Sequence, residues 1–243
     1  MRQRNFNSLP PVSFDEIFAE DEKKKDAEFH NILRNLCVVC TDEEPDLRRF
    51  SNLENWEEVK KYNFVNDTND LFCRLFKKGD KVVIVFYCHF PQFSCEDVYN
   101  HLSRGWAIPQ FKQAYEYFKK IKSRFTNSKV YLTGSNIGGS TAQFVGLYNK
   151  DIATVTFNAV GIGCLYPQLI KTYMATNITN YVSSNVSKIL REKHLGEVKI
   201  IYKPQYIAQD KLPKPENNSR PEINNLFDFD NLKFFKSSCN ALA

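Results

Sequence analysis

The residues best arranged for chemistry lie in a glycine-bounded turn, residues 134–139, with the sequence GSNIGG. An apolar segment precedes this turn and an Ala- and Gly-containing segment follows it, so the sequence predicts a strand, a sharp turn and a helix. Hydrolases present a catalytic serine on a G-x-S-x-G turn of this kind, where small residues let the backbone pack closely. Here the apex residue is Asn136. An amide has no ionisable proton, so no neighbouring base can make it a nucleophile.

Two other interpretations of the glycine turn need no nucleophile. A phosphate-binding loop, G-x-x-x-x-G-K-[ST], would use Gly134, Gly139 and Thr141, but Ser140 stands where the lysine should be. Without that lysine the charge of a bound phosphate is poorly neutralised. The simplest interpretation is that two glycines let a helix cross close to a strand. We therefore expect no cofactor.

Cysteine and histidine residues provide the other candidates for chemistry. Cys37 and Cys40 form a single C-x-x-C with no second pair and no histidine at ligand spacing, so we interpret them as two thiols on an apolar helix and expect no metal site. His89 could meet Cys88 or Cys95 in a thiol-based site, but no partner acid or oxyanion turn is evident. Adjacent residues on a strand also point to opposite faces, so Cys88 and His89 cannot both line one pocket.

Apolar strands and amphipathic helices alternate around the turn. We expect strands at 81–88, 129–134 and 153–158 to lie adjacent and parallel, with a helix at 109–125 covering them. A hairpin turn at 78–80 joins the first of these strands to "DLFCRLF". "YVSSNVSKIL" is expected to be a loop and "EVKIIYK" a strand. This order predicts an α/β fold, a mostly parallel sheet with helices on both faces.

Length and charge limit the remaining possibilities. The 243 residues are expected to form a single domain with a helical N-terminal region, an extended arm at 1–12 and a C-terminal tail at 205–243. The net charge of +5 is scattered, unlike the dense basic stripe of a nucleic-acid-binding protein. No apolar run approaches a membrane span, and the N-terminus lacks the apolar core of a secretory signal. We expect an intracellular protein with no membrane span that binds no nucleic acid.

The order and spacing of these segments resemble those of the class 3 lipase family of α/β-hydrolases, from about residue 50 to 190. "VYLTGSNIGGSTAQF" is similar to the strand and G-H-S-L-G-G-A-x-A elbow of that family. "CEDVYNHL" is similar to its D-W-x-x-N-L, with Asp97 and Asn100 in place, and "TVTFNAVGIG" to the strand after the elbow. The resemblance implies an α/β-hydrolase-like sheet with Asn136 at the nucleophile position.

The same resemblance implies that the catalytic residues of the family are replaced. Asn136 takes the position of the serine, and Asn185, in a loop similar to the N-Y-V-x-x-D of the family, takes that of the acid. A neutral amide cannot stabilise an imidazolium. The base of the family is a histidine near the C-terminus, whereas His194 is the last histidine here and precedes a strand. Tyr87 and Cys88 replace the Arg and Gly of the oxyanion loop. We therefore expect a protein that is not an enzyme.

Two classes of function remain open. The first, which we favour, is a structural protein that keeps the scaffold and assembles with itself as a homo-oligomer or lattice; matrix proteins of viral occlusion bodies, the polyhedrins, are an example. Polar arms, abundant aromatic residues and seven cysteines favour assembly, with an intermolecular disulfide at Cys239 or Cys37. Within this class the alternative is a pseudoenzyme that binds a lipid or protein partner. The second class is an esterase or lipase with a relocated active site.

Overall fold

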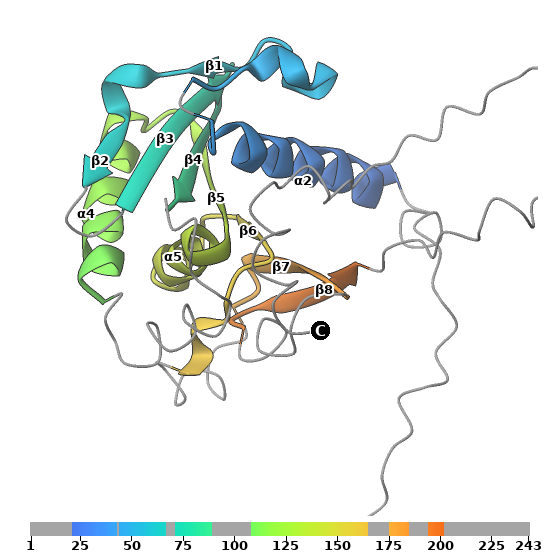
Figure 1. The fold of residues 1–243 in the computed structure, drawn as a ribbon, viewed down its shortest axis with the longest axis vertical. Coiled ribbons are helices and arrows are strands. Elements are labelled where there is room, and N and C mark those ends of the chain that lie inside the picture. Colours follow the sequence, from blue (N-terminus) through green and yellow to red (C-terminus); the bar gives the residue numbers. More distant parts are fainter. Residues whose placement is uncertain are drawn as a thin grey trace, which may run out of the picture.

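One mixed β-sheet organises the chain in a computed structural model that describes residues 21–42, 44–66, 71–88, 108–164, 175–184 and 194–201. The sheet has the strand order β1-β3-β4-β5-β6-β7-β8, and β2 also pairs with β3 (Figure 1). The strands are β1 (Glu57–Glu58), β2 (Phe64–Asn66), β3 (Leu71–Lys78), β4 (Lys81–Tyr87), β5 (Lys129–Ser135), β6 (Thr154–Phe157), β7 (Ile178–Ser183) and β8 (Glu197–Ile201).

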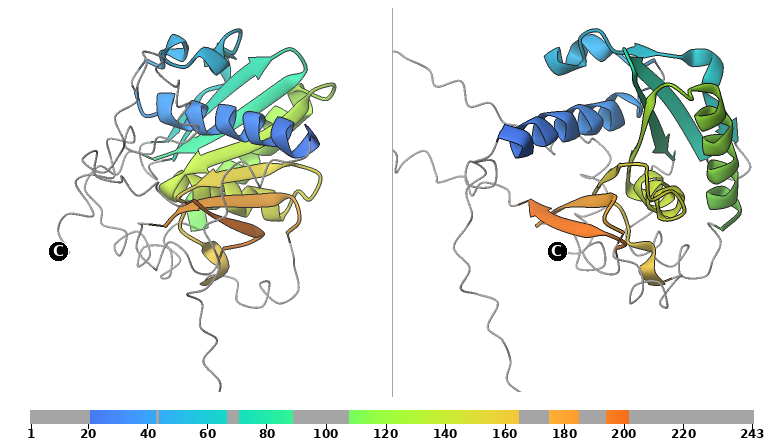
Figure 2. Two further views of the ribbon diagram at one scale, coloured as in Figure 1. Left: turned by 90° about the vertical axis from the view of Figure 1, so that its right-hand side faces the viewer. Right: turned by 180° about the vertical axis from the view of Figure 1, so that it is seen from behind.

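Helices lie on both faces of this sheet. They are α2 (Asp21–Val39), α4 (Ile108–Arg124) and α5 (Asn136–Leu147), and the shorter 3-10 helices are η2 (Leu47–Arg49), η3 (Ser51–Leu53), η4 (Lys60–Tyr62) and η5 (Ile162–Cys164). Figure 2 shows α2 on one face of the sheet and α4 and α5 on the other. None of the helices within the described ranges has the length and apolar character needed to cross a lipid bilayer.

The central strands confirm the expected α/β architecture. β3 and β4 form an antiparallel hairpin whose last pair is Lys78 with Lys81, and Gly79 in its turn has a φ of +58°. Glycine adopts this left-handed conformation without a steric cost. From β4 onward the strands β4, β5, β6, β7 and β8 are all parallel neighbours. The expected strands at 81–88, 129–134 and 153–158 and the helix at 109–125 are therefore confirmed.

Strand β7 departs from the sequence-based expectation, which gave residues from Tyr181 onward to a loop. Asparagine is uncommon in strands. Asn180 nevertheless lies fully buried in β7, where its side chain accepts a hydrogen bond from Thr156 Oγ1 (2.7 Å) and donates to the carbonyl oxygens of Leu195 (2.7 Å) and Glu197 (3.1 Å). These three bonds satisfy the buried amide. Tertiary structure thus overrides the low strand propensity of the residue.

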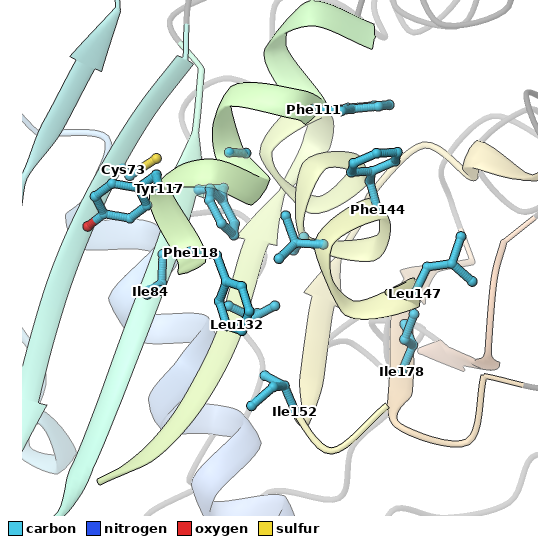
Figure 3. Close-up of a cluster of buried hydrophobic side chains, with 14 of the residues drawn as sticks. Cys73, Ile84, Phe111, Tyr117, Phe118, Leu132, Phe144, Leu147, Ile152 and Ile178 are labelled. Carbon is cyan, nitrogen blue, oxygen red and sulfur yellow. The ribbon is translucent and has the colours of Figure 1, made fainter. Parts of the chain in front are cut away.

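The core on the α4 and α5 side follows from the spacing of apolar residues in α4. Phe111, Ala114, Phe118 and Ile121 recur at intervals of three and four residues and are all buried against the sheet. The ring of Phe111 stacks on that of Phe144 from α5 at 5.1 Å (Figure 3). This contact fixes α4 beside α5, and α5 in turn packs on β4, β5 and β6.

The core on the other face lies under α2. The apolar side chains of its second half pack against Val83, Val85 and Phe157 of the central strands. Its first half is attached by a polar contact, in which Nδ1 of His30 lies 2.9 Å from the hydroxyl of Tyr181. Burial and, to a lesser extent, nearby Lys199 lower the pKa of His30 to about 4, while Asp26 and Glu197 oppose the shift.

The lowered pKa of His30 predicts a loss of stability in mild acid. The unfolded chain binds a proton at this histidine near pH 6.5 and the folded chain only near pH 4, so the free energy of unfolding falls as the pH drops through this window. A His30→Gln variant cannot titrate there. Between pH 7 and pH 5 we expect the unmodified protein to lose about 1 kcal/mol more stability than this variant, measured by urea denaturation. Equal losses would contradict the prediction.

Candidate functional site

The turn between β5 and α5 has the geometry of a nucleophile elbow. Ser135 ends β5 in an extended conformation, with φ −121° and ψ 154°, and the chain then reverses into α5 at Asn136, whose φ is +53°. Asn136 is thus at the strand–turn–helix junction, as the sequence predicts. Both side chains are partly exposed, at the carboxyl edge of the parallel strands.

The glycines of the turn allow contacts that no side chain would permit. A Cβ atom added to Gly138 would lie 2.1 Å from the carbonyl oxygen of Phe86 in β4, and one added to Gly139 would lie 2.6 Å from the Cβ of Ala159. A Cβ atom on Gly134 would lie 2.5 Å from the backbone of Gly138. The start of α5 is therefore pressed between the ends of β4 and β6, and this packing requires small residues.

The residue at the apex suits the backbone of the turn. The non-glycine residues with positive φ in the described part of the chain are all asparagines: Asn55 (65°), Asn136 (53°) and Asn158 (47°). Most L-residues are strained in this left-handed region, and asparagine tolerates it better than most others. The residue type at the elbow is therefore explained by backbone conformation, without any reference to catalysis.

Asn158, which the sequence analysis did not single out, ties the end of β6 to β7. Its side-chain oxygen accepts a hydrogen bond from the backbone N–H of Ser183 (2.8 Å), and its own N–H donates to the carbonyl of Tyr181 (2.7 Å). Nearby, the hydroxyl of Ser140 in α5 donates to the carbonyl of Val160 (2.7 Å). In the sequence, the signal for this role is an asparagine that directly follows an apolar strand. These bonds hold the loop after β6 against α5 beside the elbow.

Tyr87 and Cys88, at the positions where the resemblance implies an oxyanion loop, are bound to the scaffold. The Tyr87 side chain packs under α2, on the opposite face of the sheet from α5, and its hydroxyl accepts a hydrogen bond from Arg74 Nε (3.0 Å). The same Arg74 nitrogen lies 3.7 Å from Glu58 Oε1, with both side chains largely buried. Cys88 Sγ accepts a hydrogen bond from Nε2 of the buried Gln110 (2.9 Å).

The positions expected for an acid and a base give no catalytic pair within the described residues. Asn185 lies just outside them, beyond the end of β7. His194 is buried, with Nδ1 3.2 Å from Gln143 Nε2. His194 precedes the amino end of β8, whereas Asn136 follows the carboxyl end of β5. Because these strands run parallel, the two residues lie at opposite ends of the strands. His30 lies under α2, against Tyr181.

The structure describes only one of the two cysteines proposed for an intermolecular disulfide. Cys239 lies outside the described residues. Cys37 carries a free thiol and is buried under α2, with its sulfur 3.3 Å from the hydroxyl oxygen of Thr133. Burial raises the pKa of Cys37 to about 12, which disfavours the reactive thiolate. A disulfide from Cys37 to another copy stays a prediction, and it requires α2 to move away from the sheet.

No family model and no curated protein matches the chain. Among solved structures it is similar to the Lip2 lipase of Yarrowia lipolytica, at 13% identity and a TM-score of 0.51, over 75% of this chain and 80% of that one. It is also similar to MDLA of Penicillium cyclopium, at 10% identity and a TM-score of 0.50, over 76% and 82% of the two chains. Identities this low show the fold alone: the chain has the α/β-hydrolase-like fold of fungal lipases.

Proposed function

We propose that the protein is a catalytically inactive lipase-fold protein with a structural, self-assembling role. The observation that carries the first part is the amide of Asn136 at the apex of an intact elbow. A serine hydroxyl at such an apex is activated by a histidine, but an amide cannot be deprotonated by any side-chain base. The turn is retained with its glycine packing while the nucleophile is absent.

The surroundings of the elbow support the same conclusion. Tyr87 and Arg74 form a buried contact under α2, and Cys88 is held by Gln110, so these side chains contribute to packing. Both described histidines, His30 and His194, have buried partners away from the elbow. Fold and activity are separable, because the chemistry of a hydrolase depends on the site and not on the sheet that carries it.

The proposed structural role rests on the edge of the sheet at β8. Within the described residues β8 pairs with β7 alone, so its outer edge offers backbone donors and acceptors to a further strand. Val198 and Ile200 of this strand are 37% and 36% exposed. Exposed apolar residues on an edge strand promote pairing between molecules, and the two charged residues of β8, Glu197 and Lys199, form an ion pair with each other (3.4 Å). We infer that this edge contributes to contacts between copies.

The first experiment tests for hydrolytic activity. The purified protein should not hydrolyse short-chain p-nitrophenyl esters above background, and a serine-reactive fluorophosphonate probe should not label it. An Asn136→Ser variant should also stay inactive, because the new hydroxyl has no base to take its proton. A fungal lipase serves as the positive control. Labelling of the unmodified protein would overturn the proposal that it is inactive.

A second experiment asks whether Asn136 is kept for its backbone conformation. Asn136→Gly should leave the free energy of unfolding nearly unchanged, because glycine adopts positive φ freely, whereas Asn136→Ala should cost about 1 kcal/mol. Asn127→Ala is the matched control, since Asn127 is exposed and has an ordinary φ. Denaturant titration measures all three variants. If alanine were tolerated at position 136 as well as at 127, the backbone would not explain the asparagine.

The assembly role is tested at β8. Sedimentation velocity of the full-length protein should show oligomers that grow with concentration, and Ile200→Lys should shift them to monomers, because a lysine on an edge strand opposes pairing. Tyr148→Lys is the matched control, since Tyr148 is exposed at the end of α5 and away from this edge. A full-length protein that stays monomeric at every concentration would refute the assembly role. Binding of a lipid or protein partner would then be the better account.

A further inference from the structure

A cavity of about 780 Å³ lies between the first half of α2 and the amino-terminal part of the parallel strands. Its wall on the α2 side includes Lys25, Phe29 and His30, and its floor includes Lys81 and Tyr131 from the starts of β4 and β5. The volume is within the range of small-molecule sites, about 300–1,000 Å³. Because Asn136 follows the carboxyl end of β5, this cavity is separate from the elbow.

One end of the cavity concentrates hydrogen-bond donors around a phenylalanine. Lys25 and Phe29 lie one helical turn apart on α2, and so share a face of that helix. Nζ of Lys81 lies 4.8 Å from the centroid of the Phe29 ring, and the same ring makes an edge contact with Tyr131 at 4.6 Å between centroids. Two ammonium groups and one phenol therefore gather at this end.

These three donors are not engaged by other described residues. Within the described part of the chain, neither Lys25 nor Lys81 lies within ion-pair distance of a carboxylate, and the hydroxyl of Tyr131 makes no hydrogen bond. Burial raises the pKa of Tyr131, and Asp80 and Asp26 raise it further. The phenol therefore stays protonated near neutral pH and can donate a hydrogen bond.

The opposite end of the cavity is already neutralised. Nζ of Lys199 lies 3.4 Å from Oε2 of Glu197, and His30 contacts the hydroxyl of Tyr181. Asp26, the other carboxylate on the cavity wall, is close enough to raise the pKa of both His30 and Tyr131, so it acts on both ends of the cavity. The cavity wall thus carries three lysines and two carboxylates, and one of these carboxylates, Glu197, is paired with Lys199.

We propose that this cavity binds a small organic phosphate ester, with the phosphoryl group held by Lys25, Lys81 and Tyr131. A phosphate group presents three strong acceptor oxygens, which match two ammonium groups and a hydroxyl. The organic part of the ligand lies toward the rings of His30 and Tyr181, which are in edge contact with each other on the cavity wall. This site needs no catalytic elbow, and the proposal does not depend on the structural role proposed above.

Isothermal titration of the full-length protein with phenyl phosphate tests the proposal. We expect one site per chain, with tighter binding than inorganic phosphate and no binding of phenol. Lys81→Gln should weaken phenyl phosphate binding about tenfold, as expected for one lost charged hydrogen bond. Tyr131→Phe should weaken it severalfold with the ring retained. Lys60→Gln, which removes an exposed lysine on η4 outside the cavity, is the matched control and should leave the affinity unchanged.

Four results would overturn the assignment. The first is the absence of phenyl phosphate binding at millimolar concentration. The second is an equal effect of Lys60→Gln and Lys81→Gln, which would show attraction by the net positive charge alone. The third is benzoate binding as tightly as phenyl phosphate, which would exclude selectivity for phosphate. The fourth is full affinity in Tyr131→Phe and Lys81→Gln variants whose thermal melting confirms that they are folded.

Discussion

The close approach of α5 to the ends of β4 and β6 is the contact on which the rest of the structure depends. Gly138 lies against the carbonyl of Phe86 and Gly139 against Ala159, so the helix begins in a space with no room for side chains. This approach places α5 across three parallel strands, where Phe144 can stack on Phe111 and position α4. The helical layer formed by α4 and α5 therefore depends on the small size of Gly138 and Gly139.

The same constraint explains how an elbow persists without a nucleophile. A chain that leaves β5 and starts α5 within one residue requires a left-handed conformation at position 136. The catalytic serine of a hydrolase elbow is strained in this conformation, whereas asparagine tolerates it better. Asparagine also occupies the positive-φ positions 55 and 158, where the resemblance assigns no catalytic role. The backbone conformation alone is therefore enough to explain the asparagine at position 136.

Sequence patterns predicted the parts of the fold that rest on local signals. The apolar runs of β4 and β5, the apolar spacing of α4 and the glycines of the elbow each specify an element without reference to distant residues. Strand β7 was missed because Asn180 is unfavourable in a strand until Thr156, Leu195 and Glu197 surround it with hydrogen-bond partners. The contact of Arg74 with Tyr87 was equally inaccessible, since two adjacent strands create it. Asn185, which the resemblance places at the position of the acid, and the tail at 205–243 lie outside the described residues.

Helix α2 packs on the sheet with its second half and lines the cavity with its first half. Its second half is fixed by apolar contacts and by the approach of Cys37 to Thr133, and its first half by His30 and Tyr181. Burial moves the pKa of Cys37 upward and that of His30 downward, so both groups are neutral near pH 7. Neutral partners attach the helix to the sheet without burying charge, which would be costly. Among the described residues Lys25 and Lys81 make no ion pair, and both line the cavity. The cavity at the amino ends of the parallel strands thus carries charged groups, while the glycine turn lies at their carboxyl ends.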